Sequence, residues 1–168
     1  MIILICGFSG AGKSTLLKKL QTSAPKSTVC ADLDDLMEFF LNQQSKVPKK
    51  LGEHIQILEM ERFRKIERMT LDNFIKNNPE AILALGGGTL NDNNILGLKK
   101  KAKILFIDVP FETCWERIKN DSNRPLVAQG MDVMRKLYND RRKVFKLADA
   151  SISSDIKYEE MMELAADL

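Results

Sequence analysis

A glycine-rich segment near the start of the chain has the residue types and spacing of a phosphate-binding loop. Residues 7–14, GFSGAGKS, match G-x-x-x-x-G-K-[ST] at every fixed position, after an apolar run at Ile2–Cys6 and before a helical pattern. Glycines let the backbone turn its N–H groups toward phosphate oxygens, and the helix N-terminus adds its positive end. Lys13 can reach the β- and γ-phosphates, and the Ser14 hydroxyl can hold Mg²⁺. We predict a nucleotide site formed by Gly10, Ala11, Gly12, Lys13, Ser14 and Thr15.

A P-loop alone does not separate a kinase from a GTPase or an ATP-driven switch. The chain contains no N-K-x-D motif for reading guanine, and its 168 residues are few for a motor protein. These two observations favour a small kinase, with ATP as the phosphoryl donor.

A pair of carboxylates, Asp32 and Asp34, follows the second expected strand. Both should lie at the carboxyl edge of a parallel sheet, where α/β proteins form their ligand sites. Asp34 can accept a hydrogen bond from an acceptor hydroxyl, and Asp32 can bind a water of the Mg²⁺ shell. Asp35 more naturally serves the N-terminus of the next helix. Helix capping by all three acids is the alternative interpretation.

Two further motifs suggest an acceptor site. Arg64 and Glu67 stand three residues apart in a helical pattern, so they share a face and Glu67 can hold the guanidinium. A plain surface ion pair is the alternative. Gly86, Gly87 and Gly88 follow an apolar strand, and three consecutive glycines predict a backbone that something approaches closely.

The elements that must position these residues alternate between short β-branched runs and longer helical patterns. This alternation predicts an α/β fold, three layers with a five-stranded parallel sheet between helices. Strands are expected at Ile2–Cys6, Ser27–Cys30, Ala81–Leu85, Lys103–Val109 and Ala150–Ser153. Helices are expected at Lys13–Gln21, Asp34–Gln43, Ile55–Lys76, Phe111–Lys119, Met131–Leu147 and Tyr158–Ala166.

The longest expected helix and two irregular stretches complete this pattern. The core-facing stripe of the helix is predicted to contain Ile55, Leu58, Ile66, Met69 and Ile75. Asn42–Glu53 and Asn120–Gly130 are polar and contain prolines, which is typical of surface loops and of mobile lids beside a nucleotide site.

The composition indicates one ordinary soluble domain over residues 1–168, with 44% hydrophobic and 29% charged residues. No apolar run reaches the length of a membrane span and no basic leader precedes Ile2, so a cytoplasmic protein is expected. A net charge of +3 does not suggest nucleic acid. Three cysteines without CxxC spacing suggest reduced, buried thiols, and the single histidine, His54, is expected to be a surface or helix residue.

Taken in order, these motifs resemble the shikimate kinase family. The family pattern is a P-loop, D-x-D after the second strand, F-R-x-x-E on a helix, G-G-G after the third strand, R-P-L in a lid, and a late arginine. In this chain the series reads GFSGAGKS, Asp32-Leu33-Asp34, Phe63-Arg64-Lys65-Ile66-Glu67, Gly86-Gly87-Gly88, Arg124-Pro125-Leu126 and Arg141.

The resemblance implies phosphorylation of the shikimate 3-hydroxyl by ATP and Mg²⁺, in the pathway to chorismate and the aromatic amino acids, by a monomer. Asp34 would contact the hydroxyl that is phosphorylated, and Asp32 would support Mg²⁺. Arg64 and Arg141 would bind the substrate carboxylate, which suits guanidinium groups because they bind carboxylates at two points. Backbone contacts would come from the glycines 86–88.

Further roles follow from the same resemblance. Arg124 would fold over the phosphates from a lid at residues 119–131 and act in catalysis with Lys13 and Asp34, while Arg117 would stack on adenine. Residues 34–75 would form the substrate-binding segment. Arg141 is assigned in preference to Arg142 because it stands four residues after Leu137 and four before Phe145, which is the family's spacing.

The chain also departs from the family pattern near the acceptor site. It has Leu58-Glu59-Met60-Glu61-Arg62 where the family has Gly-Glu, it carries an inserted basic loop, SKVPKK, and it has Phe145 where relatives have tyrosine. Two alternatives therefore remain: a kinase of another small hydroxy acid, such as a gluconate-type kinase, and a non-catalytic ATP-binding regulator.

Overall fold

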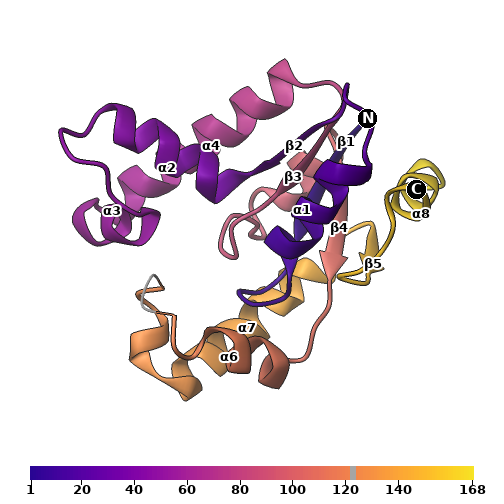
Figure 1. Cartoon of the computed structure of the whole chain (residues 1–168). Coiled ribbons are helices and arrows are strands. Elements are labelled where there is room, and N and C mark those ends of the chain that lie inside the picture. Colours follow the sequence, from indigo (N-terminus) through magenta and orange to yellow (C-terminus); the bar gives the residue numbers. More distant parts are fainter. Residues whose placement is uncertain (122–123) are drawn as a thin grey trace.

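The computed structural model of the chain describes residues 1–121 and 124–168. Its centre is one sheet of five parallel strands in the order β2-β3-β1-β4-β5 (Figure 1). The strands are β1 Ile2–Cys6, β2 Val29–Asp32, β3 Ala81–Ala84, β4 Lys103–Ile107 and β5 Ala150–Ile152. The predicted five-stranded parallel sheet is confirmed.

Helices follow the strands and cover both faces of the sheet. They are α1 Lys13–Ser23, α2 Leu33–Gln43, α3 Leu51–Ile57, α4 Met60–Asn77, α5 Ile95–Lys99, α6 Phe111–Ile118, α7 Met131–Phe145 and α8 Tyr158–Ala166, with a 3₁₀ turn, η1, at Val127–Gln129. In Figure 1, α2, α3 and α4 lie together at one side of the carboxyl ends of the strands, and α6 and α7 lie at the other.

Two hydrophobic cores result from the alternation of side chains along each strand. Ile3 and Ile5 of β1 pack in a core with α1, α6 and α8, whereas Leu4 and Cys6 pack in a second core with α2, α4 and α5. Both faces of β1 are therefore buried, as expected for a central parallel strand. The three-layer prediction is confirmed.

Most predicted bounds agree with the structure to within two residues, but two predicted elements were wrong: one strand is shifted as a whole and one helix is broken. The second strand runs over Val29–Asp32 rather than Ser27–Cys30, because residues 25–28 form a turn in which the Thr28 N–H donates to the Pro25 carbonyl. The helix expected over residues 55–76 is two helices, since Leu58 and Glu59 are extended, with ψ of 142° and 137°. The break lets Leu51, Ile55 and Leu58 pack against the second core.

The predicted stripe of the long helix was also partly wrong. Met69 is 53% exposed, and the buried face of α4 is instead formed by Phe63, Glu67, Leu71 and Phe74. Because the helix breaks at Leu58 and Glu59, the buried faces of α3 and α4 do not follow one continuous helical repeat.

The stretch Asn42–Glu53 is not wholly irregular, because α3 begins at Leu51. Asn42 fixes the loop that precedes this helix: its Nδ2 donates to the Lys49 carbonyl at 2.9 Å and its Oδ1 accepts from the Lys49 N–H at 2.8 Å. His54 Nε2 lies 2.8 Å from the same Oδ1, so the histidine is in a helix, as predicted, but is buried rather than on the surface.

The three cysteines are free; Cys6 and Cys114 are buried, whereas Cys30 is only half-buried. None of the helices in the described ranges combines the length and the apolar character that crossing a bilayer would require.

Candidate active site

The P-loop connects β1 to α1 through a backbone that only glycine accommodates. Gly10 and Gly12 have φ values of 84° and 101°, a region that side chains with a Cβ rarely adopt. A Cβ on Gly10 would also lie 2.6 Å from the carbonyl oxygen of Cys114 in α6. The loop is therefore shaped by its glycines and held closely against α6.

Phe8, a freely variable position of the motif, anchors this loop in the first core. Its ring is 2% exposed and meets the ring of Tyr138 edge-on at 5.2 Å, with Phe111 at 6.4 Å. Such aromatic contacts stabilise beyond the area that they bury. The sequence motif carries no signal for this anchor.

Lys13, in the first turn of α1, folds back onto the loop. Its ammonium donates to the carbonyl oxygens of Gly7 and Phe8 at 2.7 and 3.1 Å. Burial lowers the pKa of Lys13, and the charges of Asp34 and Asp32 oppose this change. The lysine thus lies beside two carboxylates at the mouth of the P-loop.

Asp32 performs two tasks at the end of β2. Its Oδ1 accepts the N–H of Asp34 at 3.0 Å and caps α2, while its Oδ2 accepts the hydroxyl of Ser14 at 2.8 Å. Capping and a place beside the phosphate loop therefore coexist. Asp35 lies exposed in the first turn of α2, next to the helix N-terminus.

Asp34 is a carboxylate in an unusual environment. Burial, and next the charge of Asp32, raise the pKa of Asp34 to about 6, although Lys13 lowers it. A carboxylate with such a pKa is a better proton acceptor near neutral pH than an ordinary aspartate.

The Arg64–Glu67 pair is not a plain surface pair. Glu67 is 3% exposed and its Oε2 accepts Arg64 Nη1 at 2.6 Å, while its Oε1 accepts the hydroxyl of Thr89 at 2.7 Å. Both carboxylate oxygens thus have donors, which burial of a charge requires. Thr89 is a residue that the sequence motifs missed; its only sequence signal is its place directly after the three glycines.

Each of the three glycines faces a different functional side chain. A Cβ on Gly86 would lie 2.7 Å from Asp34 Oδ1, and one on Gly87 would lie 3.1 Å from Arg141 Nη1. One on Gly88 would lie 2.5 Å from Arg64 Nη2 and 3.0 Å from an Arg141 nitrogen. The predicted close approach is confirmed, and it brings a carboxylate and two guanidinium groups to one stretch of backbone.

Arg141 and Arg142 of α7 point to different surroundings. Arg142 forms a two-point ion pair with Asp108, with N–O distances of 2.9 and 2.5 Å. Arg141 lies against Gly87 and Gly88, where burial, and next the charge of Arg64, lower its pKa to about 10. Arg141 therefore stays charged at neutral pH, and the two neighbouring guanidinium groups have the charge and the donors that an anion requires.

The remaining predicted arginines lie on the nucleotide side. Arg117, at the end of α6, donates to the Gly10 carbonyl at 2.8 Å. Arg124 donates to the hydroxyl of Ser9 in the P-loop and pairs with Asp121 at 2.8 Å. Of the predicted lid, residues 119–131, Ser122 and Asn123 lie outside the described residues.

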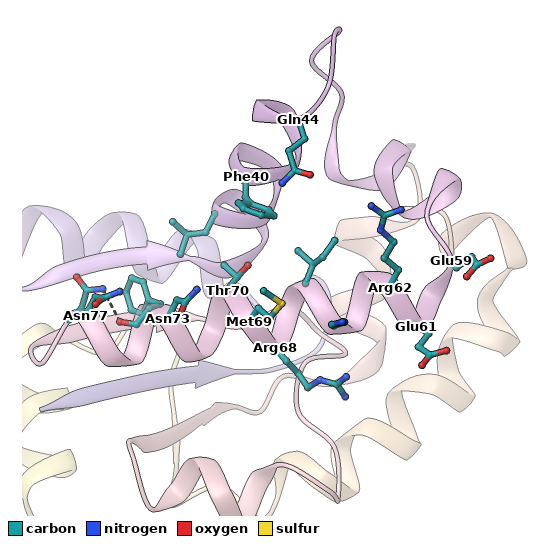
Figure 2. Close-up of a pocket in the computed structure, with 15 residues that line it drawn as sticks. Phe40, Gln44, Glu59, Glu61, Arg62, Arg68, Met69, Thr70, Asn73 and Asn77 are labelled. Carbon is teal, nitrogen blue, oxygen red and sulfur yellow. Dashed lines mark hydrogen bonds between the residues drawn. The ribbon is translucent and has the colours of Figure 1, made fainter.

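A cavity of about 490 Å³ lies among these groups, with Lys13, Asp34, Gly87, Arg117 and Arg124 in its wall. A larger groove of about 800 Å³ lies between α2 and α4 on another side of α4 (Figure 2). Its walls include Phe40, Met69 and Asn73, but none of the predicted site residues. Most of the predicted P-loop residues, Asp34 and Arg124 therefore line the smaller, polar cavity.

The donor set beside the P-loop suits Mg²⁺ held jointly with phosphates. Within residues 1–121 and 124–168, no cluster of three or more His, Cys, Asp or Glu residues could hold a metal alone. Mg²⁺ usually takes one or two protein oxygens and completes its shell with phosphates and water. The oxygens of Ser14 and Asp32, which are hydrogen-bonded to each other, fit that pattern.

Comparison with known proteins agrees with this geometry. The family model described as shikimate kinase matches residues 9–166. Shikimate kinase from Lactococcus lactis subsp. lactis is 33% identical over 97% of this chain and 94% of its own length, and that from Sulfurihydrogenibium is 31% identical over 92% and 89%. The crystal structure of shikimate kinase from Aquifex aeolicus, 26% identical, covers 99% of this chain and 96% of its own with a TM-score of 0.78. The chain belongs to the shikimate kinase family.

Proposed function

We propose that this protein transfers the γ-phosphate of ATP to the 3-hydroxyl of shikimate, giving shikimate 3-phosphate and ADP. The observation that carries the proposal is the convergence of Asp34, Arg64 and Arg141 on the three glycines after β3. This arrangement offers a carboxylate for an acceptor hydroxyl and two guanidinium groups for a substrate carboxylate. It lies beside the P-loop, because a Cβ on Gly87 would lie 3.1 Å from Arg141 Nη1 and 3.7 Å from the Ser9 backbone nitrogen. Membership of the shikimate kinase family identifies the compound that carries both groups.

On the nucleotide side, the P-loop backbone would bind the phosphates of ATP, with Lys13 moving from the carbonyls of Gly7 and Phe8 to phosphate oxygens. Arg124, already beside Ser9 of the P-loop, would add positive charge over the transferred group. Arg117 would stack on adenine next to Gly10. Phosphoryl transfer depends mainly on such positioning and charge neutralisation.

On the acceptor side, the carboxylate of Asp34 would accept a hydrogen bond, and finally the proton, from the attacking hydroxyl. Its raised pKa makes that proton transfer less unfavourable. The two guanidinium groups of Arg64 and Arg141 would bind the substrate carboxylate and thereby aim the hydroxyl at the γ-phosphate.

Mg²⁺ is proposed as the metal partner of ATP, held beside the hydroxyl of Ser14, with Asp32 contacting it through water. When bound, it would neutralise charge on the β- and γ-phosphates. We also propose residues 34–75 as the substrate-binding segment and 119–131 as the lid of a single domain, 1–168. A cytoplasmic monomer that needs neither nucleic acid nor membrane stays a prediction; light scattering tests the oligomeric state.

An ADP-release assay with Mg-ATP tests the function. We expect turnover that requires shikimate, with little or none for gluconate or nucleoside monophosphates. Turnover with gluconate alone would indicate a kinase of another hydroxy acid. ATP binding without turnover for any acceptor would indicate a regulator, and either result would overturn the proposal.

A further inference from the structure

The carboxylate of Glu67 connects two separate elements at the acceptor site. One oxygen accepts Arg64 Nη1 at 2.6 Å within α4, and the other accepts Thr89 Oγ1 at 2.7 Å from the loop after β3. Glu67 and Thr89 are 3% and 4% exposed, so the bond between them is shielded from water. The second bond is the feature that the family pattern F-R-x-x-E does not contain.

We propose that Thr89 is a positioning residue for the substrate carboxylate: acting through Glu67, it sets the orientation of the Arg64 guanidinium. This inference rests on the proposed function of Arg64. It adds to the site a residue that touches neither substrate.

The hydroxyl of Thr89 is well placed for this role because its backbone is held on both sides. The Thr89 N–H donates to the Gly86 carbonyl at 3.1 Å, and its own carbonyl accepts Asn94 Nδ2 at 2.7 Å. Oγ1 also lies 3.0 Å from the position of a Cβ on Gly86, next to Asp34. The hydroxyl therefore belongs to the same rigid turn that faces the carboxylate of Asp34.

The hydrogen bond to Glu67 leaves one edge of the Arg64 guanidinium free. With Nη1 bonded to Glu67, Nη2 lies against Gly88 beside Arg141, and this is the edge left for a substrate carboxylate. A Glu67 held by a single donor can rotate about its last torsion, and the arginine would follow it. Small displacements of positioning groups have large effects on binding and catalysis, because the bound geometry must be accurate.

The test is Thr89→Val, which keeps the shape and the backbone bonds but removes the hydroxyl. We expect the shikimate KM to rise roughly tenfold, as for the loss of one hydrogen bond to a buried charge, with the ATP KM within about twofold of wild type. Thr89→Ser should restore the KM. Thr28→Val, which removes a half-buried threonine hydroxyl near Tyr158 in the turn before β2 and outside the proposed site, is the matched control and should change neither constant.

A double-mutant cycle separates positioning from general stability. If Thr89 acts through Arg64, T89V should raise the KM of an R64A enzyme little or not at all, since coupled residues are not additive. Multiplying effects, an unchanged KM in T89V, or a failure of T89S to restore it would each overturn the inference. If T89V does not fold, the same double-mutant cycle is measured with T89A.

The proposed function can fail separately. If the wild-type protein shows no shikimate-dependent turnover, the proposed function is wrong. The link from Thr89 through Glu67 to Arg64 can then still be measured by NMR of the Arg64 guanidinium. There, restricted rotation should keep the Nη signals separate in wild type and let them merge in T89V. Equal spectra for the two proteins would overturn the link itself.

Discussion

Asp34 Oδ1 lies 2.7 Å from the point that a Cβ on Gly86 would occupy. The contact joins the first turn of α2 to the loop after β3, so one methyl group at Gly86 would press on the carboxylate proposed to accept the hydroxyl proton. The same methyl group would meet Thr89 Oγ1 at 3.0 Å. A side chain at position 86 would therefore disturb both the packing of the turn and the position of the Asp34 carboxylate.

Gly86→Ala should lower kcat by roughly 10²-fold, because a displacement of about 1 Å at a positioning group costs that much. Steady-state kinetics with shikimate would measure it. Gly97→Ala is the control: a Cβ there meets nothing within 4 Å, and Gly97 lies within α5, so the variant should keep its activity and gain stability of about 0.5–1 kcal/mol. Full activity in G86A would contradict the placement of Asp34.

Asp34→Asn should lower turnover by roughly 10²-fold or more while ATP binding survives, because an amide cannot take the hydroxyl proton. Calorimetric titration of the variant with ATP measures whether ATP binding is retained. Loss of ATP binding in D34N would mean that the residue is structural.

The pH dependence of kcat/KM should follow the same group. The ionised form of Asp34 accepts the hydrogen bond, so activity should fall about tenfold per pH unit below the pKa of about 6. The profile of the wild-type enzyme between pH 5 and 8 measures this. A profile that is flat through pH 6 would exclude Asp34 as the proton acceptor.

Ionisation of Asp34 should favour activity but lower the free energy of unfolding. Its pKa is raised in the folded protein, so the folded state binds the proton more tightly than the unfolded chain, whose carboxyl has a pKa near 3.8. The charged form thus lowers the free energy of unfolding as pH rises from about 4 through 6. D34N should be more stable than wild type at pH 7.5, by on the order of 1–3 kcal/mol, and the difference should disappear near pH 3–4. Urea denaturation of wild type and D34N at these two pH values tests the sign of the difference in the free energy of unfolding.

The two neighbouring arginines of α7 provide a matched pair. Arg141→Lys, like Arg64→Lys, should raise the shikimate KM about tenfold or more with little change in the ATP KM, because lysine cannot bind a carboxylate at two points. Arg142→Lys should have little effect, since Arg142 forms an exposed pair with Asp108. Kinetics that reverse this order would assign the carboxylate to Arg142.

Several features of the site were predictable because they are local. The P-loop, the carboxylates after β2 and the triple glycine each need only neighbouring residues in a fixed order, and β-branched runs predict buried strands. These patterns were sufficient for the five parallel strands and for the strand, glycine-rich loop and helix that form the P-loop.

Other features depend on contacts between distant elements. No glycine or proline marks the break at Leu58 and Glu59; it exists because α3 packs its apolar residues on the second core. In the same way, Arg141 and Arg142 are adjacent and chemically identical. The family's spacing favoured Arg141, but only the packed structure shows that Arg141 lies against Gly87 and Gly88 while Arg142 pairs with Asp108.

The amino-acid order alone thus predicted a phosphate-binding loop, a parallel sheet that carries it, and carboxylates and arginines near the edge of that sheet. The tertiary structure decided which of them meet. Glu67 is buried with Thr89, 22 residues away, as its second donor, and burial followed by the charge of Asp32 raises the pKa of Asp34. Burial and partnership are properties of the packed molecule, and no local pattern encodes them.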